Sequence, residues 1–315
     1  MNPQNRLIVS WSPHLHKKES VKRIMWMVVL SLIPAGIAGV YIFGPGALWV
    51  IVLGVVSAVA TEGLIQIFTK RKLTIFDGSA VLTGLLLAYN LPPRVPFWLP
   101  IVGAFFAIAI AKQAFGGLGQ NIFNPALVGR VFLMASWPKY MATFTRPLNY
   151  DAITSATPLA LLKEGKVLTG TSYWDLFLGN RGGCIGEVCI LALLLGAAFL
   201  FIRGYISWHI PVTYIFSVGL VTYIFGAPGL FKGDWLFHIL SGGLILGAFF
   251  MTTDYVTSPL TRKGQIIFAL GSGLITAVIR LWGGYPEGAS YAILMMNAAT
   301  PIIDRYTKNR VYGTK

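Results

Sequence analysis

The sequence predicts an all-α polytopic membrane protein with about ten transmembrane helices. Of its 315 residues, 55% are hydrophobic and only 11% are charged, whereas soluble domains carry about 25% charged residues. The mean hydropathy is +0.68. The net charge of +14 is spread between apolar runs instead of forming one patch, so we expect it to orient the chain in a membrane and not to bind nucleic acid.

The first half of the chain contains five apolar runs. A helix that crosses a bilayer needs about 20 apolar residues, and we judge the length of each run against this number. They predict helices at 24–43, 47–68, 77–91, 96–112 and 121–137. The third run is short and stops at Pro92-Pro93, which predicts a broken or half helix. Residues 1–23 lack the apolar core of a signal peptide, so we expect a cytoplasmic segment followed by a first membrane anchor.

The second half repeats this pattern after a long polar segment. Its apolar runs predict helices at 188–203, 209–226, 235–252, 265–282 and 288–303. Lys and Arg are denser in the short segments on the side of both termini, as in Lys70-Arg71-Lys72. By the positive-inside rule, both termini, including the tail 304–315, are cytoplasmic, and the segment 138–187 is external, in a cell membrane.

The two halves share short glycine-rich patterns. Gly78–Gly84 resembles Gly242–Gly247, and Gly116-Gly117 resembles Gly283-Gly284. The offset is about 165 residues throughout, and an odd number of helices in each half inverts the second copy, so two inverted five-helix repeats (24–137 and 188–303) with interrupted helices are predicted. Chance similarity of glycine-weighted segments is the alternative.

The external segment contains the sequence Asp151-Ala-Ile-Thr-Ser-Ala-Thr157-Pro. Polar loops of about 50 residues are uncommon and often functional. By local chemistry alone, Ser155 or Thr157 would cap a short helix whose first residue is Pro158.

The same residues resemble the motif at which flavin mononucleotide (FMN) is joined to threonine by a phosphoester bond. Asp151, Thr154, Ala156 and Thr157 match the motif, and Ser155 stands where glycine is usual. The helix pattern and the segment Gly116–Ala126 are also similar to the RnfD/NqrB family of membrane subunits, and the short N-terminal segment favours RnfD.

The resemblance implies a membrane subunit of an Rnf-type complex, which moves electrons between ferredoxin and NAD and couples them to Na⁺ or H⁺ transport. Thr157 would carry FMN, attached by a separate flavin transferase, and a noncovalent riboflavin would lie toward the cytoplasmic side. The other Rnf subunits would bind NAD and iron–sulfur clusters, since this chain has neither a Gly-x-Gly-x-x-Gly pattern nor a cluster-binding cysteine pattern. Arg146, Lys163, Lys166 and Arg181 are candidates to balance the phosphodiester, although solvated loop positions are the simpler interpretation.

A second candidate site lies near the membrane midplane. Asn121 and Asn124 follow a glycine-rich segment and begin a helix, where a polar cofactor edge would bind; packing through small residues is the alternative. Arg130 is an intramembrane charge, with Asp77 or Asp254 as its expected partner and all three as ion-path candidates. We expect Glu62 to be interfacial, with an ion ligand as the alternative, and we assign no function to His209, His238, Cys184 or Cys189.

Two rival functions remain. Inverted repeats with interrupted helices also suit a solute channel of the urea or ammonium type, and a structural scaffold within a larger complex needs no cofactor at all. The Asp151–Thr157 motif discriminates between them and the flavoprotein, because neither rival requires a flavin acceptor.

Overall fold

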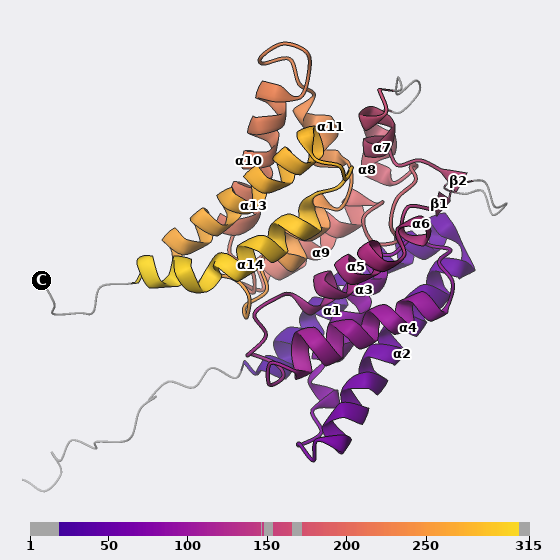
Figure 1. Ribbon diagram of the computed structural model, residues 1–315, viewed down its shortest axis with the longest axis vertical. Coiled ribbons are helices and arrows are strands. Elements are labelled where there is room, and N and C mark those ends of the chain that lie inside the picture. The colour runs from indigo at the N-terminus through magenta and orange to yellow at the C-terminus, as the bar shows by residue number, and fades with distance from the viewer. Residues whose placement is uncertain (1–18, 146, 148–153, 166–171, 309–315) are drawn as a thin grey trace, which may run out of the picture.

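The computed structural model describes residues 19–145, 147, 154–165 and 172–308. They form a helical bundle in two groups that follow the two halves of the chain (Figure 1). The first group comprises α1 (Val21–Phe43), α2 (Pro45–Phe68), η2 (Ile75–Asp77), α3 (Ser79–Tyr89), α4 (Trp98–Phe105), the π-helix η3 (Phe106–Gln113) and α5 (Pro125–Ser136). The second comprises α9 (Ile190–Ile202), α10 (His209–Phe225), α11 (Trp235–Leu240), α12 (Leu244–Leu246), the π-helix η4 (Gly247–Met251), α13 (Arg262–Trp282) and α14 (Ala289–Tyr306).

Three of these helices, α1, α2 and α13, are long and apolar enough to cross a membrane. Large apolar side chains also cover the surface of the bundle, for example Ile37, Trp49 and Phe216, each more than 60% exposed. A water-facing surface of this kind would be unstable, so lipid surrounds these helices. The other predicted segments coincide with shorter or interrupted helices, and their crossing of the membrane stays a prediction.

The predicted interruptions occur where glycine takes a left-handed backbone conformation. Gly78 (φ +83°) precedes α3, and Gly242 (φ +69°) separates α11 from α12. These two glycines correspond in the proposed repeats. The other proposed pair differs, because Gly116 and Gly117 have positive φ whereas Gly283 has φ −75°. The inverted repeat therefore stays a prediction.

The groups pack through close helix crossings. Within the first group, α2 meets α3 so closely that a Cβ on Gly84 would lie 2.5 Å from the carbonyl oxygen of Gly54. Between the groups, α1 packs along α9 and α5 contacts α14. Small residues at such crossings let two backbones approach, which is how helices associate in lipid.

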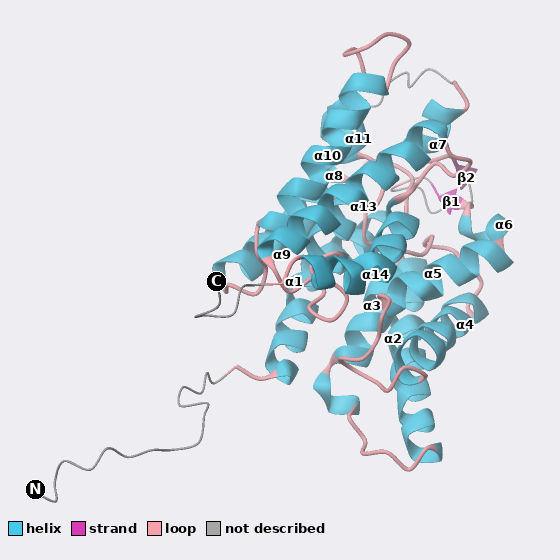
Figure 2. Ribbon diagram, turned by 60° about the vertical axis from the view of Figure 1, so that its left-hand side comes forward, coloured by secondary structure: helices cyan, strands magenta, loops and turns pink. Residues whose placement is uncertain are grey.

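The segment between α5 and α9 lies at one end of the bundle (Figure 2). It contains α6 (Pro138–Met141), β1 (Phe144–Thr145), β2 (Thr154–Ser155), α7 (Pro158–Lys163) and α8 (Tyr173–Leu178). The two strands are antiparallel, with Phe144 opposite Ser155. After α8 the chain returns into the bundle, where the N–H groups of Ile185 and Gly186 donate to the carbonyls of Leu91 and Tyr89. Residues 181–188 are consequently buried, although nearly all of them fall in the predicted external loop.

Candidate functional site

Thr157 lies at the start of α7, on the wall of a cavity that we call the Thr157 cavity. Its Oγ1 accepts a hydrogen bond of 3.2 Å from the N–H of Ala160, and Pro158 is the first helical residue. The predicted cap is therefore confirmed for Thr157, and Ser155 lies in β2. The cavity is also lined by Arg130, Arg181, Cys184, Glu187, Tyr285 and Glu287.

The rest of the motif is described only in part. Thr154 and Ser155 form β2, and Ala156 is exposed immediately before Thr157. Asp151 lies outside the described residues, as do Arg146 and Lys166. Lys163 donates to the carbonyls of Ile279 and Tyr285, so its ammonium group is engaged by α13 and the loop that follows it.

Arg130 on α5 is buried and forms an ion pair with the partly buried Glu287, with Nη2 2.5 Å from Oε2. Its Nη1 donates to Oδ1 of Asn90, and Nε has no partner. The expectation that Asp77 or Asp254 pairs with Arg130 is therefore wrong. Glu287 precedes α14 and reaches Arg130 across the contact between α5 and α14.

Glu187 is the second acidic residue of the Thr157 cavity, and it is 4% exposed. Its Oε1 accepts from the N–H of Cys184 at 3.0 Å, and its Oε2 has no hydrogen-bond partner. Burial, followed by the carboxylate of Glu287, raises the pKa of Glu187 to about 7, although Arg130 and Arg181 oppose the shift. The carboxyl group therefore titrates near neutral pH.

Two further guanidinium groups complete the surroundings of Glu187. Arg181 is 5% exposed and donates to the backbone carbonyl of Glu187 at 2.9 Å, so the expectation of a solvated Arg181 is wrong. Arg280 on α13 is equally buried and donates to the carbonyls of His238 and Ser241. We call these five residues the Glu187 cluster: Arg130, Arg181, Glu187, Arg280 and Glu287.

A second cavity begins at the N-terminus of α5, and we call it the Asn124 cavity. Oδ1 of Asn124 accepts from the N–H groups of Ala126 and Leu127, and Asn121 donates to the carbonyl of Phe123. Both asparagines are buried and line the cavity, and the cofactor contact expected of them stays a prediction. The other lining residues that bear on its chemistry are Ser79, Lys112, Phe249, Phe250, Asp254 and Tyr255.

Lys112 connects this cavity to a buried carboxylate. Its Nζ lies 2.7 Å from Oε2 of Glu62, and the two side chains are 2% and 1% exposed. Gln113 also donates to Glu62 at 2.9 Å. The carboxylate of Glu62 is therefore buried within the protein as the partner of Lys112, and its interfacial position in the membrane stays a prediction.

Comparison with known proteins decides the family. The model of the NQR2, RnfD, RnfE family matches residues 8–313. The chain belongs to this family.

Three relatives are similar to the chain over nearly its whole length. The D subunit of the Na⁺-translocating ferredoxin:NAD⁺ oxidoreductase complex of Acetobacterium woodii is 52% identical to this chain, over 99% of this chain and 97% of the relative. The D subunit of the proton-translocating ferredoxin:NAD⁺ oxidoreductase complex of Clostridium ljungdahlii is 50% identical over 99% and 98%. The D subunit of the ion-translocating oxidoreductase complex of Stutzerimonas stutzeri is 39% identical over 94% and 93%. The resemblance inferred from the sequence is confirmed.

In this RnfD-family chain, the two predicted aspartates lie near the Asn124 cavity but not at equivalent places. Asp77 precedes α3 and accepts from the N–H and Oγ of Ser79, whose Oγ also accepts from Lys112. Asp254 follows η4, lines the cavity and accepts from Thr257. Burial raises the pKa of Asp254. The two aspartates do not occupy equivalent places in the two halves, since Asp77 precedes α3 whereas Asp254 follows η4.

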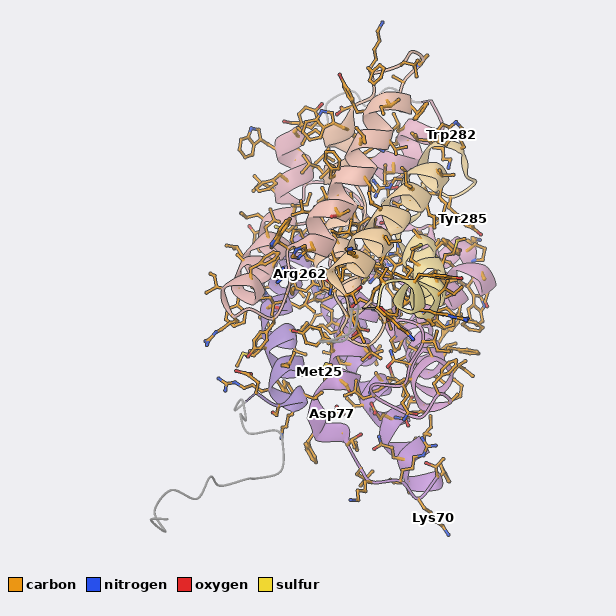
Figure 3. All side chains as sticks on the ribbon, turned by 90° about the vertical axis from the view of Figure 1, so that its left-hand side faces the viewer. Met25, Lys70, Asp77, Arg262, Trp282 and Tyr285 are labelled. Carbon is orange, nitrogen blue, oxygen red and sulfur yellow. The ribbon has the colours of Figure 1, made fainter. Side chains whose placement is uncertain are left out.

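The family member thus has two cavities along one helix. Asn124 and Ala126 line one, and Arg130 and Met134 line the other. Ten residues separate Asn124 from Met134, which is about 15 Å along an α-helix. Figure 3 labels Met25 of the Asn124 cavity and Tyr285 of the Thr157 cavity, which lie at different levels of the bundle.

Sequence reasoning missed Glu187 and Glu287. Each stands directly before an apolar run in a chain with only 11 acidic residues. That scarcity, combined with the position at a helix start, is the signal that would have found them. Among the described residues, no three His, Cys, Asp or Glu side chains converge to hold a metal ion.

Proposed function

We propose that the chain is the RnfD-type subunit of an Rnf-type complex and carries FMN as a phosphoester on Thr157. In this role it passes electrons within a ferredoxin:NAD⁺ oxidoreductase whose turnover drives Na⁺ or H⁺ across the cell membrane. Relatives bearing these activities in their names are 50–52% identical over 99% of the chain. The observation that carries the proposal is that Thr157 lines a cavity that buried guanidinium groups also line.

The residues around Thr157 fit a phosphodiester. Arg130 and Arg181 both line the cavity, and the Nε of each is buried without a partner. The Glu187 cluster contains three guanidinium groups and two carboxyl groups, so at least one positive charge remains for a ligand. A phosphodiester supplies one negative charge and accepts hydrogen bonds from guanidinium groups. FMN bound here would supply reversible electron transfer, while the protein would set its position and surroundings.

The position of Thr157 also suits attachment by a separate flavin transferase. Exposed Ala156 and the strand β2 precede it, so an enzyme would reach this threonine more easily than one inside the bundle. The cap bond from Ala160 requires only an oxygen acceptor, and a phosphoester retains that oxygen.

We further propose that the Asn124 cavity holds the noncovalent flavin, riboflavin, expected from the resemblance. Asn121, Asn124 and Lys112 provide polar groups for the ring edge, and Phe249 and Tyr255 provide apolar faces. Both termini would be cytoplasmic and Thr157 external, as the charge pattern predicts. The ion path would pass near Asp77 and Asp254, and the remaining Rnf subunits would complete the electron path.

The attachment is tested by expressing the complex with its flavin transferase and imaging flavin fluorescence on a denaturing gel. We expect a fluorescent band in the wild type and complete loss in Thr157→Val, because valine has no hydroxyl to bond phosphorus. The matched control is Thr143→Val, at an exposed threonine before β1, which should retain the fluorescence.

A different outcome would redirect the assignment. A dark wild-type band, with the transferase active on another substrate, would leave Thr157 as a helix cap and make a solute channel the leading function. Electron transfer that persists in an assembled Thr157→Val complex would instead favour a scaffold role.

A further inference from the structure

One buried group in the Thr157 cavity has no role in holding a phosphodiester. Glu187 is an acid among guanidinium groups, and its Oε2 is buried without any hydrogen-bond partner. A fully ionised carboxylate in that position would lack the bonds that normally stabilise a buried charge. The other carboxyl oxygen, Oε1, accepts a hydrogen bond from the N–H of Cys184. This bond holds the Glu187 side chain at the cavity wall.

The guanidinium groups that face Glu187 donate the hydrogen bonds of their Nη atoms to other acceptors, and the Nε of each has no partner. Arg130 on α5 is paired with Glu287 and Asn90. Arg280 on α13 donates to the carbonyls of two residues near the break between α11 and α12. Arg181, on the same segment as Glu187, donates to its backbone carbonyl and not to its carboxyl group. The carboxyl group of Glu187 therefore lies near three guanidinium groups but forms an ion pair with none of them.

Glu187 also lies close to the other carboxylate. A Cβ on Gly243 would lie 2.9 Å from Oε2 of Glu187 and 2.8 Å from Oε1 of Glu287. The two carboxyl oxygens therefore lie close to the same backbone position. Two neighbouring carboxylates in an interior site do not both ionise easily. Arg130 and the N–H of Gly243 stabilise the ionised form of Glu287, so Glu187 is the acid of the two that binds a proton more readily.

Other titratable groups near the cavity are poor proton acceptors. The Cys184 thiol is buried, and burial raises its pKa well above the usual value. His238 on α11 does not line the cavity. The cavity reaches exposed residues at its rim, including Pro138, Ala142 and Tyr285, which gives protons a route from water.

We propose that Glu187 is a proton-exchanging residue of the Thr157 cavity. One electron that a one-electron donor of the complex delivers to a redox group in this cavity adds one negative charge. Glu187 takes one proton from water at the rim, which changes its carboxylate to a carboxylic acid and balances that charge. The proton leaves when the electron passes to the next carrier. The redox group rests on the proposed function, whereas proton binding by Glu187 does not.

The first test is a potentiometric titration of the Thr157-linked flavin in the assembled complex at several pH values. Uptake of a proton on reduction requires an initially ionised carboxylate, so the wild-type midpoint potential should fall as pH rises above about 7. Glu187→Gln keeps the size of the side chain but cannot ionise, and this part of the pH dependence should be lost. The control is Glu164→Gln, at an exposed acid beyond α7. Identical pH profiles for wild type and Glu187→Gln would overturn the proposal.

The second test separates Glu187 from the flavin assignment. Infrared difference spectra between acid and alkaline pH are recorded on the Thr157→Val complex, which lacks the proposed attachment residue. A carboxylic acid signal that titrates near neutral pH and disappears with the added change Glu187→Gln supports the proposal even if no flavin is found on Thr157. If Glu187→Gln does not assemble, ¹³C-glutamate labelling of the wild type identifies the group. Absence of any glutamate signal that titrates near neutral pH would refute proton exchange by Glu187. It would not affect the conclusion from the flavin fluorescence gel.

Discussion

At the scale of single residues, charged side chains in the interior form ion pairs. Glu62 and Lys112 form a fully buried pair, and buried Arg130 forms a second pair with the partly buried Glu287. Taking charges out of water is costly, and loss of one partner from a buried pair costs about 3–5 kcal/mol. Such pairs are therefore weak contributors to stability but strong constraints on which side chains face each cavity. Glu187 differs because no guanidinium donates a hydrogen bond to its carboxyl group.

The acidic residues near the Asn124 cavity give a prediction about ion transport. Asp254 lines the cavity, and Asp77 connects to Lys112 through Ser79. Asp254→Asn and Asp77→Asn remove a carboxylate but keep its shape, so we expect coupled ion uptake into proteoliposomes to slow several-fold while flavin content stays normal. The control is Asp304→Asn on α14, which lines neither cavity. Unchanged ion uptake in both variants would remove these aspartates from the ion path.

At the scale of helices, glycine determines where a helix is interrupted and where two helices touch. Gly78 and Gly242 adopt left-handed conformations at the interruptions, a backbone that other residues avoid. Gly84 acts differently, because it lies within α3 and serves the crossing of α2 with α3. A side chain there would meet backbone atoms, which cannot rotate away.

The crossing predicts the effect of one added methyl group. Gly84→Ala would place Cβ 2.5 Å from the carbonyl oxygen of Gly54 and 2.8 Å from Cα of Val55. Forcing the helices apart should destabilise the protein by about 1–3 kcal/mol, measured as a lower thermal midpoint of the detergent-solubilised complex. Gly284→Ala is the control, since nothing lies within 4 Å of its added Cβ. Equal thermal midpoints for the two variants would contradict the tight crossing.

At the scale of the whole molecule, α5 links the two cavities and also joins the two helix groups through α14. The Asn124 cavity opens around the start of α5, and the Thr157 cavity lies around its C-terminal part. The α5 residues that line the two cavities, from Asn124 to Met134, span about 15 Å of this one helix.

The orientation of the bundle is tested by labelling with a membrane-impermeant maleimide. On a Cys189→Ser background, Trp174→Cys on α8 should react from outside in intact cells, because it is exposed in the segment that carries Thr157. Lys70→Cys, exposed between α2 and η2, should react only after the membrane is opened. The reverse pattern would invert the proposed topology.

The membrane class, the places of the main helices and the family all follow from the amino-acid sequence alone. These features depend on local chemistry, because a helix in lipid needs an apolar run and a helix start needs a cap such as Thr157. The motif around Thr157 is likewise contiguous, so its resemblance can be recognised without any knowledge of the fold. The attached flavin, the crossing of the shorter helices and the inverted repeat stay predictions.

Which charges meet depends on the tertiary structure. Arg130 and Glu287 are 157 residues apart, and Glu62 and Lys112 are 50 apart. The sequence offers several possible acidic partners for each cation and contains no distance between them, so it predicts the wrong partners for Arg130 and does not predict the pairing of Glu62 with Lys112. The choice depends on helix packing: the contact of α5 with α14 brings Glu287 to Arg130, and the return of residues 181–188 into the bundle buries Glu187 beside them. Because burial and neighbouring charge set the protonation of a carboxyl group, the chemistry of the Thr157 cavity is a property of the fold.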